Sequence, residues 1–256
     1  MELATIFVSA FLGLLIGSFL NVVAYRVPAG SPVTSPPSSC RSCGHHIRAR
    51  DNIPVVSWLL LRGRCRDCGA PISVRYPLVE AGSAVLFGLT ALVVGVSWVL
   101  PAYLWFVAVA LVLTLTDIDH KRIPNRILYP GTIVATALLA AGAALEGAWA
   151  DLWRALGGGA AYFAFLLLVA LAARGGFGFG DVKLALLLGE FTAFRGWDVL
   201  AAGVFLAFIM GGTLSLALLL SRRAGRKDMI PFGPAMVLGA FLAVAIGERL
   251  VSWYLS

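Results

Sequence analysis

The sequence is poor in charge: only 13% of its 256 residues are Asp, Glu, Lys or Arg. A soluble domain of this size carries about 25%. Hydrophobic residues make up 60% of the chain, and its mean hydropathy is +0.90. This composition argues against an ordinary soluble enzyme and predicts a protein that lies largely in a lipid bilayer.

Several familiar catalytic motifs are also missing. The chain has no G-x-S-x-G, no H-E-x-x-H and only three histidines, His45, His46 and His120. The Gly-rich stretch 175–180 is not followed by Gly-Lys-Ser/Thr, which argues against a phosphate-binding loop there. These absences leave carboxylates as the main candidates for chemistry in the membrane.

Eight apolar runs approach the roughly 20 residues that a membrane-spanning helix needs. We expect helices at about 3–25, 77–96, 99–118, 127–145, 156–173, 182–195, 198–221 and 232–253. The run 182–195 is the weakest because it is short, and a continuous hairpin with the next span is the alternative. The first run lacks the basic segment and cleavage site of a signal peptide, so it is interpreted as a retained helix. The predicted fold class is an all-α polytopic membrane protein with about eight transmembrane helices.

Most of the 20 Lys and Arg residues fall in loops on one side of this predicted bundle. These loops follow the first, third, fifth and seventh spans, whereas the opposite loops are mainly acidic. The positive-inside rule then places the basic side in the cytoplasm and both termini outside. Topology thereby accounts for the net charge of +7, and no nucleic-acid partner is expected.

All four cysteines lie in the sizeable extramembrane segment between the first two spans. Cys40 and Cys43 form one C-x2-C pair, and Cys65 and Cys68 form a second. Two such pairs bring four thiolates together in the tetrahedral arrangement that suits a structural zinc ion. Two disulfides are the alternative, which a reducing cytoplasmic loop disfavours.

The adjacent His45 and His46 are interpreted as solvated turn residues, with a ligand role as the alternative, because four cysteines already close a zinc site. A loop of about 50 residues has too small a core to fold without such a staple. The predicted organisation is a first transmembrane helix at 1–26, a small cysteine-rich, zinc-ribbon-like cytoplasmic domain at 27–76 and a seven-helix transmembrane domain at 77–256.

Three carboxylates are predicted at the cytoplasmic edge of the membrane. Asp117 and Asp119 end the third span, and Asp181 opens the sixth. Each acid taken alone can be explained without a catalytic role, as an interfacial residue or a helix cap. Two buried carboxylates held close would instead share a proton and act as general base and general acid on water. Only one of Asp117 and Asp119 can readily face Asp181, since residues two apart point in nearly opposite directions, and helix geometry does not choose between them.

Gly178 and Gly180 directly precede Asp181. We expect these residues, which lack side chains, to leave room for the backbone of an extended peptide beside the acid. Other glycines in the spans are interpreted as close helix-packing positions. They are Gly157, Gly158, Gly159, Gly203, Gly211, Gly212 and Gly239.

On these motifs the chain resembles the type IV prepilin peptidases, the G-x-G-D membrane aspartic proteases. The resemblance extends over nearly the whole chain and is carried by TDIDHKRIPN, GFGFGDVKLA, GSFLNVVAYRVP, the four-cysteine segment and PFGPAMVLGA. It implies that Asp117 and Asp181 form the catalytic pair. Supporting roles are expected for Asp119, Gly178, Gly180 and Lys183.

The resemblance also implies a substrate and a location. Members of this family cleave prepilins or pseudopilins on the cytoplasmic side of the bacterial inner membrane, after a basic leader that ends in glycine. The expected partners are therefore such substrates and the lipid bilayer. Members with the cysteine domain typically also methylate the new N-terminal amine with S-adenosylmethionine as donor, which would link residues 27–76 to methyltransferase activity.

Two alternatives stay open. The first is a peptidase without methyl transfer, in which the cysteine loop is purely structural, because the sequence carries no independent signature of a methyl-donor site. The second is a proton-coupled transporter whose acids relay protons. The clustering of the acids at one membrane edge disfavours a transporter, since transport sites lie near the midplane.

Overall fold

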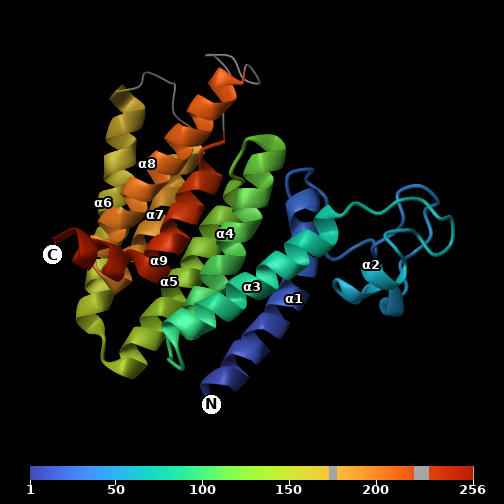
Figure 1. The fold of residues 1–256 in the computed structure, drawn as a ribbon, viewed down its shortest axis with the longest axis horizontal. Coiled ribbons are helices and arrows are strands. Elements are labelled where there is room, and N and C mark those ends of the chain that lie inside the picture. Colours follow the sequence, from blue (N-terminus) through green and yellow to red (C-terminus); the bar gives the residue numbers. More distant parts are fainter. Residues whose placement is uncertain (173–177, 222–230, 256) are drawn as a thin grey trace. The chain divides into compact units, whose positions relative to one another are not determined.

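The structure, a computed structural model, describes residues 1–172, 178–221 and 231–255, with only the backbone described beyond residue 247. Within these ranges the chain is helical, without strands and with two isolated bridges. It divides into two compact units, Met1–Val96 and Ser97–Ser256 (Figure 1). The glycines at 175–176 and the basic loop 222–227, both considered in the sequence, lie outside the described residues.

The first unit is a pair of helices joined by a long loop. α1 (Glu2–Arg26) and α3 (Arg75–Val94) run side by side (Figure 1). Glycine allows this contact: a Cβ added at Gly13 or Gly17 would lie 2.7 Å or 2.8 Å from the nearest α3 atom. Small residues of this kind let two membrane helices approach closely and gain van der Waals contact.

The loop between α1 and α3 contains two short helices, η1 (Ala49–Asp51) and α2 (Val56–Leu60), which were not predicted. Its contacts with α3 include a hydrogen bond from the backbone N–H of Val55 to a carboxylate oxygen of Glu80 at 2.7 Å. Val55 has a φ of 62°, a conformation that β-branched residues rarely adopt. The buried Glu80 therefore helps to hold a strained turn of the loop against the start of α3.

The second unit is built around one central helix. Its members are α4 (Leu100–His120), α5 (Asn125–Glu146), α6 (Trp149–Ala172), α7 (Phe179–Arg195), α8 (Trp197–Leu220) and α9 (Gly233–Leu255). Helix α7 contacts all five of the others, and most of its residues are buried. A polar residue near the start of α7 is therefore placed inside the unit.

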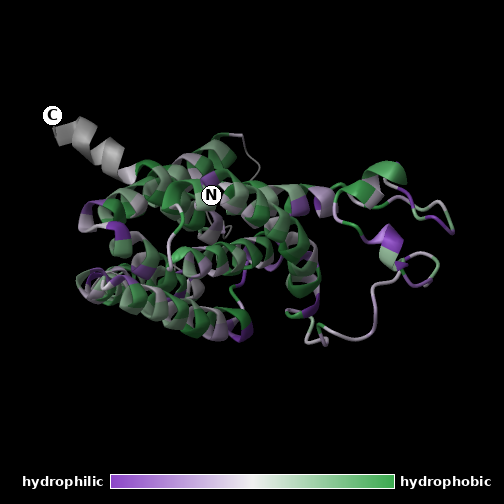
Figure 2. Cartoon of the chain, turned by 90° about the horizontal axis from the view of Figure 1, so that it is seen from below, coloured by the Kyte–Doolittle hydropathy of each residue, from purple (hydrophilic) through white to green (hydrophobic). Residues whose placement is uncertain are grey.

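Six helices among the described residues are long and apolar enough to cross a membrane: α1, α3, α4, α5, α6 and α8. The prediction of about eight spans is too high, although every predicted run forms a helix. The 17 residues of α7 span about 26 Å, less than the roughly 30 Å of a bilayer core, and four of them are charged. The described apolar part of α9 covers only Gly233–Gly247. The chain is a multi-pass membrane protein, and Figure 2 shows its helices mainly in hydrophobic colours.

Helix α6 begins at Trp149, seven residues before the predicted start of this span. The early turns carry an ion pair, with 2.7 Å between Nη2 of Arg154 and Oδ1 of Asp151. Arg154 also donates hydrogen bonds to the carbonyls of Ala193 and Phe194 at the end of α7. These charged residues satisfy one another and a helix end, which explains why hydropathy alone missed this part of the helix.

Small residues also lie at the contacts between helices in the second unit. The predicted packing role is confirmed for five glycines, because a Cβ added at any of them would press against a neighbouring helix or the segment leading into α9: Gly158, Gly159, Gly203, Gly211 and Gly239. At Gly157 the nearest such atom, on the Trp197 ring, lies at an ordinary 3.6 Å. The prediction was wrong for Gly212, which has no described atom within 4 Å of that position.

Candidate active site and metal centre

A stacked pair of aromatic rings fixes the register between α4 and α7. Phe106 and Phe191 lie with ring centroids 4.5 Å apart and an interplanar angle of 5°. The Tyr103 hydroxyl donates to the Phe191 carbonyl at 2.9 Å. Phe106 lies eleven residues before Asp117, and Phe191 ten after Asp181. Because both helices rise equally per residue, these spacings bring the two aspartates to the same end of the unit.

Asp117 and Asp181 meet at the first residue of α9. They are 5% and 8% exposed. A Cβ added to Gly233 would lie 2.7 Å from Oδ2 of Asp117 and 3.5 Å from Oδ1 of Asp181. The sum of these two distances limits the separation of the two oxygens to about 6 Å, close enough for each carboxylate to influence the ionisation of the other. The structure thus brings these two predicted residues together.

Gly233 also contacts the pair directly. Its backbone N–H donates a hydrogen bond to Oδ2 of Asp117 at 3.2 Å, across 116 positions of sequence. Because Gly233 begins α9, the N-terminal end of that helix and its unpaired N–H groups face the acid. No role was predicted for this glycine. It lies in the segment PFGPAMVLGA, but nothing in that segment indicates its distant partner.

The other acid of the D-x-D motif is placed differently. Asp119 is exposed at the end of α4, whereas Asp117 is buried. Helix α4 ends directly after His120, where Lys121 adopts a left-handed conformation and its N–H donates to the Asp117 carbonyl at 2.8 Å. Of the two acids that the sequence left open, Asp117 is therefore the one beside Asp181.

The two glycines before Asp181 are important because a side chain at either position would meet a neighbouring residue, not because their backbone angles are unusual. Gly178 caps α7 with a φ of −69°. A Cβ at Gly178 would lie 3.0 Å from Oδ2 of Asp181, and one at Gly180 would lie 3.1 Å from Cβ of Ile123. A larger side chain at either position would therefore displace the acid or the segment after α4.

Lys183 lies one turn into α7 and reaches towards α5. Its ammonium group donates to Oδ1 of Asn125 at 3.1 Å and lies 4.9 Å and 5.5 Å from the ring centroids of Phe179 and Tyr129. These contacts tie the first turn of α7, and with it Asp181, to the start of α5.

Glu190 is a buried acid that sequence reasoning missed. It is 4% exposed, and the Thr136 hydroxyl of α5 donates to its Oε2 at 2.7 Å. Glu190 lies nine residues after Asp181, about two and a half turns, and therefore on the opposite side of α7. An ionisable residue within an apolar helix is the signal that would have found it.

The four cysteines converge at the tip of the loop in the first unit. Their Sγ atoms all lie within 4.8 Å of one another, and all four thiols are free. The cluster formed by Cys40, Cys43, Cys65 and Cys68 is able to hold a metal ion. Neither His45 nor His46 belongs to this group, and both are exposed.

Two matching turns build the cluster. In the first, the N–H of Cys40 donates to the His45 carbonyl, and the N–H of Gly44 donates back to Cys40. In the second, Cys65 and Gly69 make the same two bonds, with Ala70 in place of His45. Gly44 and Gly69 have φ values of 74° and 71°, which only glycine adopts easily.

One of these thiols is prepared for metal binding. Hydrogen bonds from the backbone N–H groups of Cys43 and Ser42 lower the pKa of Cys40 to about 6, whereas the pKa values of the neighbouring Cys43 and Cys68 thiols are raised. Cys40 is therefore the thiol of this group that ionises most readily, and the thiolate is the form that binds metals.

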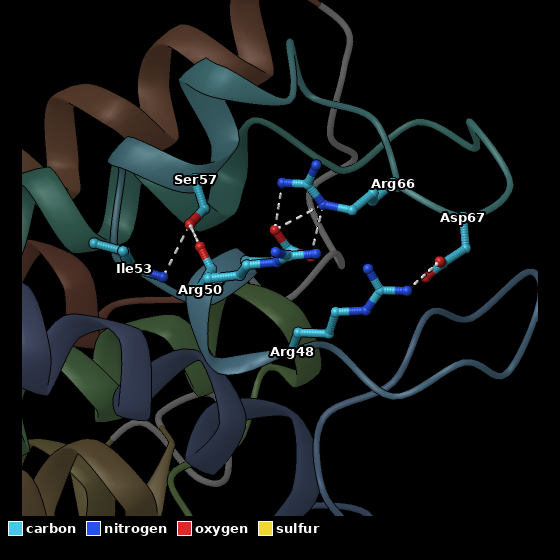
Figure 3. Close-up of polar contacts among 7 residues, drawn as sticks. Arg48, Arg50, Ile53, Ser57, Arg66 and Asp67 are labelled. Carbon is cyan, nitrogen blue, oxygen red and sulfur yellow. Dashed lines mark hydrogen bonds and ion pairs between the residues drawn. The ribbon is translucent and has the colours of Figure 1, made fainter.

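Ion pairs hold the two halves of the cysteine loop together (Figure 3). Arg66 donates from Nε to both oxygens of Asp51 at 3.0 Å and from Nη2 to Oδ1 at 2.7 Å. These hydrogen bonds lower the pKa of Asp51. A second, more exposed pair joins Arg48 to Asp67 at 3.0 Å. The first pair connects η1 to the second cysteine turn, and the second pair connects the residue before η1 to the same turn.

The two units of the chain match two different known protein domains. Residues 11–94 match the Bacterial Peptidase A24 N-terminal domain, and residues 104–216 match the Type IV leader peptidase family. The first match covers most of the cysteine-bearing unit, and the second covers the segment that holds Asp117 and Asp181.

Curated relatives extend the similarity to almost the whole chain. The chain is 34% identical over 279 residues to the prepilin leader peptidase/N-methyltransferase of Stutzerimonas stutzeri, covering 99% of the chain and 94% of that protein. A protein of the same name from Pseudomonas putida is 36% identical, with 93% and 90% covered. That of Bacillus subtilis (strain 168) is 34% identical, with 95% of each covered. No solved structure matches the chain.

Proposed function

The chain belongs to the type IV leader peptidase family, and we propose that it is an aspartic endopeptidase that removes the leader peptide from type IV prepilins and pseudopilins. The observation that carries this proposal is the approach of two buried carboxylates, Asp117 and Asp181, beside Gly233. We expect two carboxylates buried beside each other to hold one proton between them rather than two charges, which is the state required for acid–base catalysis.

The chemistry that this pair supports is direct hydrolysis of a peptide bond. The ionised carboxylate removes a proton from a water molecule as the water oxygen bonds to the carbonyl carbon. The protonated carboxylate supplies the proton that the leaving nitrogen needs when the C–N bond breaks. In this proposal Asp117 and Asp181 are catalytic. The supporting residues are Asp119, Gly178, Gly180 and Lys183.

We place the site at the cytoplasmic face of the bacterial inner membrane, with both chain termini outside. The support is the gathering of Lys and Arg residues in the loops after α1 and α4, since cytoplasmic loops carry this excess. In the same topology residues 27–76 form a cytoplasmic domain, and residues 77–256 contain the peptidase.

We propose that the cysteine cluster binds zinc in a structural role. Four thiolates suit tetrahedral zinc, and a site closed by four protein ligands leaves no position for a reacting water. The loop contains only the short helices η1 and α2, so a bound ion would supply the cohesion that a small core lacks.

We further propose that the protein methylates the new N-terminal amine of its substrate, with S-adenosylmethionine as methyl donor. The support from the relatives is their name, which includes N-methyltransferase. When bound, this donor supplies a methyl group on a sulfonium ion. Residues 27–76 would then serve methyl transfer.

A cleft in the Met1–Val96 unit fits a ligand of this kind. Its volume is about 820 Å³, within the range of small-molecule sites. Its lining includes Tyr25, Tyr76 and Arg41, with Cys40 in the wall. The guanidinium of Arg41 lies 4.3 Å from the Tyr25 ring centroid. Arginine binds carboxylates, and aromatic faces bind cations and flat rings, so Arg41, Tyr25 and Tyr76 are the residues that would hold the donor.

Mass spectrometry of a processed substrate tests both activities. Purified protein is incubated with a prepilin, with and without S-adenosylmethionine. We expect loss of the leader in both reactions and one additional methyl group only with the donor. An intact prepilin would contradict the peptidase. Leader loss without methylation would establish the alternative, a peptidase with a purely structural cysteine loop.

A further inference from the structure

One buried tyrosine near the aspartate pair has an unsatisfied hydroxyl group. Tyr162 of α6 is 5% exposed, and its hydroxyl oxygen has no hydrogen-bond partner among the described residues. Buried polar groups are nearly always paired, and an exception calls for a specific explanation, such as a bound water or a catalytic role.

Helix packing places Tyr162 close to Asp181. Helices α6 and α7 are antiparallel, because a Cβ at Gly158 would lie 3.3 Å from the Gly189 carbonyl and one at Gly159 would lie 2.8 Å from that of Leu186. Tyr162 follows these glycines by one turn on the same face of α6, and so it lies one turn nearer the start of α7. This is the turn that follows Asp181.

A second buried tyrosine in the same unit shows the contrast. Tyr103 is 1% exposed, and its hydroxyl donates to the Phe191 carbonyl at 2.9 Å. That hydroxyl has a structural partner between α4 and α7. Tyr162 has a similar burial, but its hydroxyl donates to no acceptor among the described residues.

We propose that the Tyr162 hydroxyl donates a hydrogen bond to the carbonyl oxygen of the scissile peptide. This inference rests on the proposed peptidase function. As the water oxygen bonds to the carbonyl carbon and loses a proton to the ionised aspartate, the carbonyl electron pair moves onto oxygen. A fixed donor aimed at that oxygen stabilises the developing charge. Tyr162 keeps its proton throughout, and the protonated aspartate serves the leaving nitrogen.

Two matched substitutions, Tyr162→Phe and Tyr103→Phe, test this role, since each removes a single buried oxygen. The full chain in detergent is assayed for kcat and KM on a prepilin and for its unfolding temperature. For Tyr162→Phe we expect a loss in kcat of about 10²-fold, an unchanged KM and no fall in unfolding temperature, because no internal hydrogen bond is lost. For Tyr103→Phe we expect a lower unfolding temperature and a smaller change in kcat.

Wild-type kcat in Tyr162→Phe would overturn the inference and leave the proposed peptidase standing. A loss of kcat that is accompanied by the same fall in unfolding temperature as in Tyr103→Phe would overturn it too, because it would indicate a structural role. A wild-type protein that fails to cleave would remove the proposed function itself, and with it this inference.

Discussion

Oδ2 of Asp117 accepts a hydrogen bond from the backbone N–H of Gly233 at 3.2 Å, and the carboxylate of Asp181 borders the same glycine. Three helices therefore meet here: the end of α4 and the starts of α7 and α9. A side chain at this position would disturb the contact, because a Cβ would lie 2.7 Å from Oδ2 of Asp117. The geometry of the acid pair thus depends on a backbone position in a third helix.

Substitution of Gly233 by Ala should therefore disturb the acids without unfolding the protein. The added Cβ would lie 2.7 Å from Oδ2 of Asp117, so the carboxylate must move. Displacement of a reacting group by about 1 Å lowers rates by about 10²-fold, and we expect a loss of that order in prepilin cleavage. Gly212→Ala is the matched control, since no atom of the described residues lies within 4 Å of the added Cβ. Equal activity of the two variants would show that Gly233 does not position the pair.

Bulky residues at Gly178 or Gly180 should block cleavage while the protein stays folded. A Cβ at Gly178 would already lie 3.0 Å from Oδ2 of Asp181, and one at Gly180 would lie 3.1 Å from Ile123. Gly178→Val and Gly180→Val are assayed for cleavage and for thermal unfolding. The prediction fails if either variant cleaves prepilin at the wild-type rate.

Much of the fold could be predicted from hydropathy, because a helix in lipid must be apolar over most of its length. Every predicted run coincides with a helix. The prediction placed the start of α6 too late, because charged residues such as Asp151 and Arg154 are typical of loops. In the structure they form an ion pair, and Arg154 also donates a hydrogen bond to a carbonyl at the end of α7. The count of spans was too high because α7 is short and charged and because the described apolar part of α9 covers only Gly233–Gly247.

The candidate site was only partly visible in the sequence. Acids at helix ends stand out in an apolar chain, so Asp117 and Asp181 could be singled out. The contributions of Gly233 and Tyr162 depend on which helices meet, and glycine and tyrosine are common in membrane helices for other reasons. Glu190 accepts a hydrogen bond from Thr136 on α5, a contact that no local sequence pattern predicts.

Loss of any one cysteine of the cluster should release the metal and loosen the loop. Cys→Ser at position 40, 43, 65 or 68 leaves three thiolates, which hold zinc less tightly than a closed site. Metal analysis of purified protein is expected to show about one zinc per wild-type chain and a strong reduction in each variant. The variants His45→Ala and His46→Ala are matched controls and should retain the metal. Wild-type protein purified without zinc would contradict this account.

The ion pair between Asp51 and Arg66 should make loop stability depend on pH. The pKa of Asp51 is lowered in the folded loop, so the pair stabilises the loop above the ordinary Asp value of about 4. That contribution is lost as the pH falls through the lowered pKa. Proteolysis of the loop should therefore be faster in Asp51→Asn than in the wild type at neutral pH, and the difference should disappear in strong acid.

Asp67→Asn is the control for this experiment. Its ion pair with Arg48 is more exposed, with 28% of the Asp67 side chain accessible against 9% for Asp51, and exposed pairs contribute little. We expect a smaller effect on proteolysis at neutral pH. The interpretation would be wrong if wild type and Asp51→Asn were cut at equal rates at neutral pH, or if their difference persisted in acid.

The most direct test of the central claim is prepilin cleavage by Asp117→Asn and Asp181→Asn, measured on folded protein in detergent with Asp119→Asn alongside. Asparagine keeps the shape of the side chain and removes its ability to exchange a proton. We predict that each of the first two variants loses cleavage by at least about 10²-fold, since general acid–base catalysis contributes this much or more, and that Asp119→Asn is milder. Full cleavage by either Asp117→Asn or Asp181→Asn would contradict the account.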